Sequence, residues 1–374
     1  METDNKLDVL LANQNILFFS RAIQHAGTEN VIVQLIKILK PYAGSIVLCC
    51  SDGFRTDILK EMGIRFYKIP DIESKSPIVM ARVIKTLRKI IKDEKITIIH
   101  THHRMAAFYI RIMHLDRKCC FINTSHNTFY NKKILTRYSY KNCHLISCGE
   151  MVKKNLEDIF RLNNVTVIHN AVMPFDGDII EDQLLRKLHN SGYILVGNIG
   201  RLSEQKGCEY FIESIPIVLE KCQEARFLIV GNGEDEEKLK RLVENKKLSN
   251  YVYFMGYRED IQNLMKQMDF IVLSSLWEGL PLTPIEAFSV GKTVVATAVD
   301  GTVEIIEDGK NGFLVEPRNP VQLAKKIIYL IRHNEKRIEM ENAALKRYED
   351  EFSFNIFADR YLRFYRNVIK EIGK

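Results

Sequence analysis

The chain has 374 residues, of which 46% are hydrophobic and 27% are charged. This composition is typical of a soluble globular protein, and the length suits two domains better than one. No apolar run is long enough to span a bilayer and the N-terminus has no signal-peptide pattern, which argues against an integral membrane protein. Eight cysteines without metal-like spacing predict buried, reduced thiols and a cytoplasmic protein.

Positive charge is concentrated in the first half of the chain. Residues 1–173 contain 26 Lys or Arg against 15 Asp or Glu, whereas residues 174–374 contain 28 against 32. Cations at helical spacing predict one basic helix face, formed by Arg82, Lys85, Arg88, Lys89 and Lys92. Such a face suits anionic lipid headgroups or a phosphate-bearing acceptor, and a solvated helix surface is the alternative. Nucleic acid is not expected, because no nucleic-acid-binding motif accompanies these cations.

Short apolar runs alternate with amphipathic helical runs along the chain. The first series predicts strands at 16–19, 45–50, 96–99, 121–124, 145–147 and 166–168, and the second at 194–199, 226–230, 251–254, 270–273 and 293–296. Continuous apolar strands separated by helices are typical of parallel sheets that are covered on both faces. Two such series predict an α/β fold with two Rossmann-like, doubly wound domains.

Turn-rich segments near residues 173–178 and 189–192 separate the two series. We therefore expect a first domain at 1–173, a linker at 174–192 with a short polar helix at 179–188, and a second domain at 193–353. The amphipathic C-terminal run 352–372 carries an apolar stripe that we expect to pack in a core: Phe357, Tyr361, Phe364 and Val368. A ligand would bind in a cleft between the domains, at the carboxyl ends of the strands.

Several residues of the first half directly follow predicted strands. Gly27 precedes a predicted helix at 31–39, where the chain can approach a ligand closely, although an ordinary strand–helix turn explains this glycine equally well. His100, His102 and His103 end one strand, and His126 follows the next. A structural, hydrogen-bonded histidine is the usual interpretation of such a position, and hydrogen bonding to a substrate at the cleft is the alternative for one of them. A metal site is not indicated, because no nearby ligand completes a set.

The loop Gly200–Gly207 follows the first strand of the second half. Its Arg201 and Lys206 lie five positions apart and can converge on one diphosphate, with two solvated loop cations as the alternative. The next strand ends at Gly231 in a tight turn. No P-loop, G-x-S-x-G or H-E-x-x-H sequence is present, and no nucleophile–base pair supports a covalent enzyme.

The segment Trp277–Glu286 is the most informative part of the chain. Two glutamates, Glu278 and Glu286, stand eight positions apart across a Gly/Pro-bearing turn that leads into a predicted helix. Unpaired amides at a helix N-terminus suit a phosphate, and carboxylates suit sugar hydroxyls. The alternative is a capping box with Thr283 as N-cap, Pro284 as first helical residue and Glu286 reaching back to the Thr283 amide.

In order along the chain, these motifs resemble the retaining GT-B glycosyltransferases of glycosyltransferase family 4. The resemblance extends from about residue 16 to the end, and it rests on Gly27-Thr28-Glu29, Ile99-His100-Thr101-His102, Asn170-Ala171-Val172, Gly200-Arg201…Lys206-Gly207, Gly231-Asn232-Gly233 and Glu278-x7-Glu286. It implies two Rossmann-like domains facing across a cleft, with the C-terminal helix, about 354–374, crossing back onto the first.

The resemblance also implies roles for individual residues. Glu286 would hold the ribose and Glu278 a hydroxyl of the donor sugar, while Arg201 and Lys206 would neutralise the diphosphate. His102 matches the family's histidine near the reacting sugar, and with Glu278, Arg201 and Lys206 it completes the expected catalytic set. The expected nucleotide-sugar-binding residues also include Gly27, Gly231, Tyr257, Arg258, Gly279, Leu280, Leu282 and Thr283. The base would lie near Tyr257 and Arg258 and be recognised partly by backbone.

Family members of this type generally need no metal or other cofactor, and no Asp-x-Asp motif is present. Two departures are Ala26, where many relatives have a second glycine, and Pro281, which has no N–H to donate.

The sequence therefore predicts a cytoplasmic glycosyltransferase, associated with the inner membrane surface, that moves a hexose or N-acetylhexosamine from a UDP-sugar. The expected acceptor is a surface polysaccharide or a lipid-linked oligosaccharide. A 2-epimerase of sugar nucleotides and a non-catalytic nucleotide-sugar-binding subunit are the alternatives.

Overall fold

The computed structural model describes residues 10–21, 27–51 and 56–372, and these residues fall into two compact units. The first unit extends to Asn170 and also includes the chain from Phe357 onward, and the second extends from Ala171 to Ile356. The segment expected to be a linker thus groups with the second unit. Ala26, at which the sequence departs from the family pattern, lies outside the described residues.

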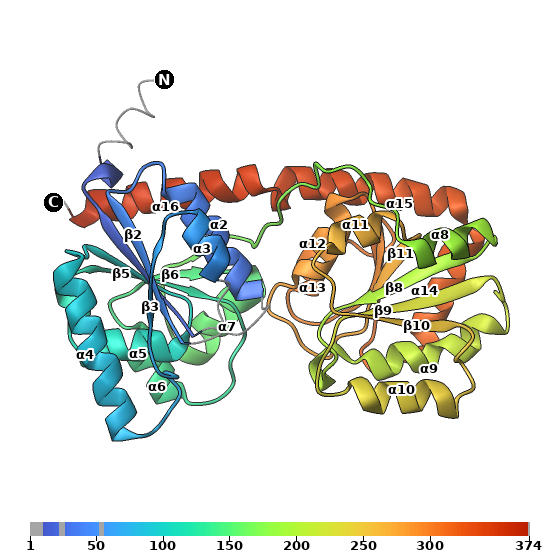
Figure 1. Ribbon diagram of the computed structural model, residues 1–374, viewed down its shortest axis with the longest axis horizontal. Coiled ribbons are helices and arrows are strands. Elements are labelled where there is room, and N and C mark those ends of the chain that lie inside the picture. The colour runs from blue at the N-terminus through green and yellow to red at the C-terminus, as the bar shows by residue number, and fades with distance from the viewer. Residues whose placement is uncertain (1–9, 22–26, 52–55, 373–374) are drawn as a thin grey trace. The chain divides into compact units, whose positions relative to one another are not determined.

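The first unit contains a seven-stranded parallel sheet with the order β3-β2-β1-β4-β5-β6-β7 (Figure 1). Its strands are β1 (Asn15–Phe19), β2 (Ser45–Cys50), β3 (Arg65–Lys68), β4 (Ile98–Thr101), β5 (Cys120–Ser125), β6 (His144–Ser147) and β7 (Val165–Val167). Its helices are α2 (Gly27–Leu39), α3 (Thr56–Glu61), α4 (Pro77–Asp93), α5 (Arg104–Ile112), α6 (Lys133–Tyr140) and α7 (Glu150–Phe160). Figure 1 shows α2 and α3 on one side of this sheet and α4, α5 and α6 on the other, which explains why its central strands are apolar on both faces.

The second unit contains a six-stranded parallel sheet with the order β10-β9-β8-β11-β12-β13. Its strands are β8 (Ile194–Ile199), β9 (Ala225–Val230), β10 (Val252–Gly256), β11 (Phe270–Leu273), β12 (Val294–Thr297) and β13 (Gly312–Val315). Its helices are α8 (Gln183–Asn190), α9 (Cys208–Leu219), α10 (Glu236–Asn245), α11 (Ile261–Lys266), α12 (Leu282–Ser289), α13 (Thr302–Ile305), α14 (Pro320–Arg332) and α15 (Asn334–Arg347). Short 3-10 and π turns lie at Leu115–Arg117, Glu204–Lys206 and Tyr348–Phe352.

Both sheets have the strand order of a doubly wound nucleotide-binding fold, so the predicted α/β class is confirmed. The chain reverses its direction of winding between β1 and β4 in the first unit, and between β8 and β11 in the second. The loops that follow these four central strands lie at the topological switch points, where such folds bind ligands.

The C-terminal helix α16 (Phe354–Ile372) packs through the predicted apolar stripe, whose four side chains are at most 9% exposed. Two buried tyrosines also attach it to the first sheet by hydrogen bonds. The Tyr365 hydroxyl lies 2.8 Å from His100 Nδ1, and the Tyr361 hydroxyl lies 3.2 Å from Thr124 Oγ1. Since His100 Nε2 also contacts Thr124 Oγ1 at 2.9 Å, both ring nitrogens of His100 are satisfied, and this histidine is structural.

Candidate active site

The two loops that the sequence singled out in the second unit follow the two central strands of its sheet. The loop 200–207 follows β8, and the segment 274–281 follows β11. Because β8 and β11 are hydrogen-bonded neighbours, their carboxyl ends bring the two loops together at the switch point. The Gly207 backbone packs so closely on the end of β11 that a Cβ there would lie 2.3 Å from the Ser274 carbonyl oxygen.

Lys206 and Glu278 meet across these loops. Lys206 Nζ lies 2.6 Å from Glu278 Oε1, and the Glu278 side chain is only 6% exposed. The same carboxylate oxygen accepts a hydrogen bond of 2.6 Å from Ser275 Oγ. A buried carboxylate with a charged and a hydroxyl donor holds one orientation. Arg201 differs, because it is exposed and pairs with Glu234 at 3.1 Å on the protein surface.

The backbone of the Glu278 turn is held from the other side by the residues that follow β12. Glu278 N–H donates to Asp300 Oδ2 at 2.9 Å, and Gly301 N–H donates to the Gly279 carbonyl at 2.9 Å. Burial and the neighbouring Glu278 carboxylate raise the pKa of Asp300. Neither Ser275 nor Asp300 was predicted from the sequence, although both are polar residues just beyond an apolar strand, which is the available signal.

Helix α12 begins at Leu282, with Pro281 as its N-cap and without a side-chain capping bond. The capping-box alternative is therefore wrong in its register, since Thr283 lies inside the helix and its hydroxyl reaches the Ile199 carbonyl at 3.5 Å. Within the described part of the chain, no acceptor meets the amides of Leu282 and Thr283. These amides carry the partial positive charge of the helix N-terminus, which suits an anion. Leu280 beside them is buried.

Glu286 lies one turn into α12, and its side chain is partly buried. Burial raises the pKa of its carboxyl group to about 7, although Lys206 opposes this shift. No hydrogen-bond donor contacts this carboxylate among the residues that the structure describes. A partly buried carboxylate without donors is suited to accept hydrogen bonds from the hydroxyl groups of a ligand.

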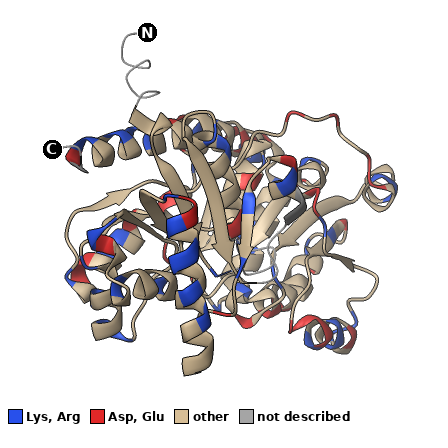
Figure 2. Cartoon of the chain, turned by 60° about the vertical axis from the view of Figure 1, so that its left-hand side comes forward, with Lys and Arg blue, Asp and Glu red and all other residues tan. Residues whose placement is uncertain are grey.

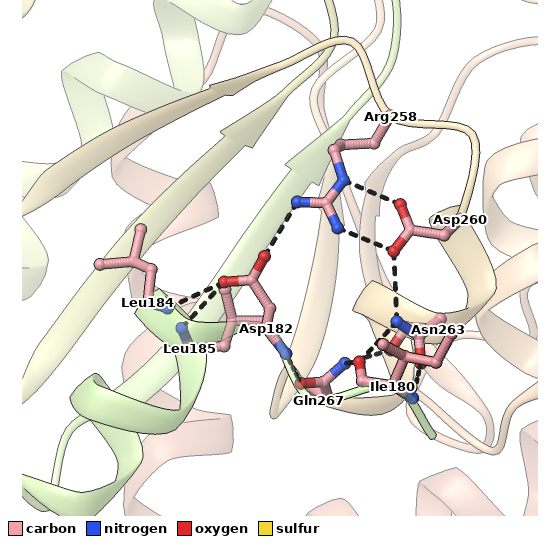
Figure 3. Close-up of polar contacts among 8 residues, drawn as sticks. All are labelled: Ile180, Asp182, Leu184, Leu185, Arg258, Asp260, Asn263 and Gln267. Atoms are coloured by element: carbon pink, nitrogen blue, oxygen red, sulfur yellow. Dashed lines mark hydrogen bonds and ion pairs between the residues drawn. The ribbon is translucent and has the colours of Figure 1, made fainter. Parts of the chain in front are cut away.

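The loops after β9 and β10 border the same edge of the sheet. Gly231 lets the backbones cross, because a Cβ there would lie 1.9 Å from the Gly200 carbonyl oxygen, and its N–H donates to the Gly256 carbonyl at 2.8 Å. Tyr257 follows β10 and is 41% exposed. The Arg258 side chain forms ion pairs with Asp182 and Asp260 (Figure 3). Only its backbone can therefore take the predicted part in base recognition.

The first unit holds the remaining predicted residues. His102 is 4% exposed, and its Nδ1 lies 3.0 Å from Nε2 of His126, while its Nε2 has no partner in the described structure. Burial lowers the pKa of both histidines, that of His126 to about 4, so the pair is neutral near pH 7. His103 instead caps α5 by accepting from Met105 N–H at 3.2 Å. Gly27 is exposed at the first residue of α2.

Comparison with known proteins identifies the class of protein. The models Glycosyl transferases group 1 and Glycosyltransferase Family 4 match residues 180–347 and 26–174. The fold is that of a glycosyltransferase with GT-B architecture: the structure of Anabaena Alr3699/HepE in complex with UDP-glucose superposes with a TM-score of 0.80 at 21% identity, covering 95% of this chain and 100% of that one.

Relatives among curated proteins agree with this class. Uncharacterized glycosyltransferase MJ1059 of Methanocaldococcus jannaschii is 31% identical over 288 residues, 69% of each chain. The UDP-Gal:alpha-D-GlcNAc-diphosphoundecaprenol alpha-1,3-galactosyltransferase of Escherichia coli is 27% identical over 317 residues, 78% of this chain and 81% of that one. The chain spans 63% and 59% of the length of two further curated relatives. This chain belongs to glycosyltransferase family 4.

Proposed function

We propose that this protein transfers a hexose or an N-acetylhexosamine from a UDP-sugar, with retention at the anomeric carbon. The observation that carries the proposal is the Lys206–Glu278 pair, whose Nζ and Oε1 lie 2.6 Å apart beside the uncapped N-terminus of α12. One strong cation and a set of unpaired amides can stabilise the charge that develops on a departing diphosphate. The HepE structure binds UDP-glucose, and the Escherichia coli relative is named for a UDP-sugar donor.

Each group near the switch point then has a role in donor binding. Lys206 and the amides of Leu282 and Thr283 hold the diphosphate, and Arg201 reaches it by leaving its exposed pair with Glu234. Glu278 accepts a hydrogen bond from a hydroxyl of the donor sugar. Glu286 accepts hydrogen bonds from the ribose hydroxyls, which supply the donors that its partly buried carboxylate lacks.

Three further assignments rest on the family resemblance. Tyr257 and the Arg258 backbone read the base, and Gly279 and Leu280 add to the phosphate-binding turn. In the first unit, Gly27 and the neutral His102 serve the reacting sugar.

A screen of UDP-, GDP- and ADP-sugars tests the proposal, with thermal stabilisation and slow donor hydrolysis as readouts. We expect UDP-sugars to raise the melting temperature, and Lys206→Ala to abolish most of this effect. Lys238→Ala is the matched control, because Lys238 is an exposed lysine of the same unit. A donor series that leaves the wild-type melting temperature unchanged would contradict the proposal. Product analysis distinguishes transfer from 2-epimerisation, and turnover distinguishes an enzyme from a binding subunit.

The proposed acceptor is a surface polysaccharide or a lipid-linked oligosaccharide, reached at a membrane surface. The five cations of the predicted basic face are exposed along α4, and none forms an ion pair with another described residue (Figure 2). On the same side of the sheet, α6 and the turn before it expose Ile134 (87%) and Tyr130 (72%) beside Lys132, Lys133 and Arg137. Cations around exposed aromatic and aliphatic side chains are typical of a surface that binds anionic lipid. No described helix is both long and apolar enough to cross a membrane.

Vesicle sedimentation tests this membrane contact. We expect replacement of Arg82, Lys85, Lys89 and Lys92 by glutamine to reduce binding to anionic vesicles, more strongly at low salt. The control replaces four exposed cations of the second unit: Lys238, Arg241, Lys246 and Lys247. Equal losses in both variants, or none in the first, would remove the claim.

A further inference from the structure

The segment that precedes α8 is hydrogen-bonded to side-chain amides of α11 and of the residue that follows it. These amides pair with backbone groups of the segment, as a neighbouring β-strand would. Asn263 Oδ1 accepts from Ile180 N–H at 2.9 Å, and Asn263 Nδ2 donates to the Ile180 carbonyl at 2.9 Å. Gln267 donates to the same carbonyl at 3.0 Å and accepts from Asp182 N–H at 2.8 Å. The Ile180 N–H and carbonyl and the Asp182 N–H are therefore paired, which holds the segment in one position on the second unit.

Arg258 joins this segment to the loop after β10 (Figure 3). Its guanidinium makes two parallel bonds of 2.8 Å to the Asp260 carboxylate, and its Nη1 donates to Asp182 Oδ2 at 2.9 Å. The other oxygen of Asp182 caps α8 by accepting from Leu184 and Leu185 N–H, at 3.0 and 3.3 Å. A bidentate arginine held by two carboxylates is a rigid connection, because its planar fork has few alternative geometries.

This connection holds residues 256–258 in place at Arg258. At the other end, the Gly256 carbonyl accepts from Gly231 N–H at 2.8 Å, and Gly231 packs on Gly200. The short stretch from Gly256 to Arg258 is thus held at both ends, although no regular secondary structure continues beyond β10.

We propose that Arg258 and Asp182 are positioning residues that fix the 256–258 backbone as the reader of the nucleotide base, so that a carboxylate outside the binding site determines base selectivity. This inference rests on the proposed function, in which that backbone contacts uracil. Backbone donors and acceptors discriminate between bases only when they are held in register with the base edge, and a loop that shifts by a fraction of an ångström loses this discrimination.

The variant Asp182→Asn tests the inference with little change to the fold. Asparagine caps a helix as well as aspartate does, so the bonds to Leu184 and Leu185 are kept, whereas the ion pair with Arg258 is lost. We expect the affinity for UDP to fall about fivefold to tenfold and the UDP-to-ADP affinity ratio to fall with it. Both affinities are measured by calorimetry on the full chain. Glu181→Gln is the matched control, since Glu181 is the neighbouring carboxylate and, among the described residues, its side chain pairs only with the exposed Arg186.

A double-mutant cycle provides the second measurement. Once Arg258→Ala has removed the guanidinium, Asp182→Asn should cause no further loss of selectivity. A merely structural role would lower the melting temperature of Asp182→Asn and leave the UDP-to-ADP ratio at the wild-type value, and this result would overturn the inference while the proposed function stands. Absence of UDP binding by the wild-type chain would overturn the proposed function and the inference together.

Discussion

Replacing Glu286 by glutamine should make the protein more stable and the donor complex weaker. Burial raises the pKa of Glu286 from 4.5 to about 7, which corresponds to a cost of up to about 3 kcal/mol for holding the ionised group at pH 8. An acid with a raised pKa binds its proton more tightly in the folded chain. Its favourable contribution is therefore complete below pH 4.5 and is lost as the pH rises through 7.

Glutamine keeps the shape of the side chain and removes the charge. Without ligand, Glu286→Gln should unfold at a higher denaturant concentration than the wild type at pH 8, and the difference should vanish near pH 4.5. The pH series of denaturant midpoints measures this effect. Glu335→Gln is the control, because Glu335 is an exposed glutamate of the same unit.

The effect on ligand binding should have the opposite sign. In the proposed function, ribose hydroxyls donate to the ionised Glu286 carboxylate, so wild-type affinity for a UDP-sugar should rise about tenfold between pH 6 and pH 8 as Glu286 loses its proton. The glutamine variant should bind about tenfold more weakly at pH 8 and show no such pH dependence. Calorimetry with an intact UDP-sugar suits this measurement. A variant that is less stable at pH 8 and binds the donor normally would refute the reasoning.

Three further predictions concern single contacts. Lys206→Ala should cost about 2 to 4 kcal/mol of transition-state stabilisation, measured as kcat/KM, and unchanged turnover would exclude Lys206 from leaving-group stabilisation. Asp300→Gly should lower kcat and weaken UDP binding, because it frees the Glu278 turn, to which Gly279 and Leu280 of the proposed phosphate site belong. Asp300→Asn keeps an acceptor for that amide and should behave as the wild type; equal loss in both variants would mean that the charge, not the hydrogen bond, matters. Tyr365→Phe should lower the free energy of unfolding by about 1 to 3 kcal/mol, because a buried nitrogen of His100 loses its partner. Urea unfolding at pH 7 measures this cost, and a change within error would show that the hydrogen bond is unimportant.

The central strands could be predicted from the sequence because burial on both faces requires continuous apolar runs. Two edge strands were missed. β3 has charged residues at both ends and a half-buried middle, and β13 contains only four residues directly after a glycine turn. β3 has one neighbouring strand and little burial, so its sequence need not differ from that of a loop, whereas β13 is largely buried and was missed because the apolar run after the glycine is short.

The candidate site divides in the same way. The positions of Lys206 and Glu278 in loops after strands, and of Glu286 in the helix that follows, could be predicted from strand–loop–helix patterns, whereas their roles stay predictions. Asp182 and Asp300 could not, because their importance arises from contacts with residues 76 and 22 positions away. Such contacts depend on the order of the strands in the sheet. The hydrophobic periodicity of the sequence predicts strands and helices but not this order.

The two halves of the chain differ in net charge, so the proposed donor binding and the proposed membrane binding should differ in their dependence on salt. Residues 174–374 carry more acidic than basic residues, so the long-range field of this half does not attract a diphosphate. In the proposed function, attraction comes at short range from Lys206, Arg201 and the amides of α12, where salt screens weakly. The cations along α4 in the first unit are exposed and would act over a Debye length. Raising the salt concentration from 50 to 500 mM should therefore release the protein from anionic vesicles while UDP-sugar affinity changes little. A parallel loss of both would show that the same exposed cations serve both ligands, and would contradict a donor site built on buried groups.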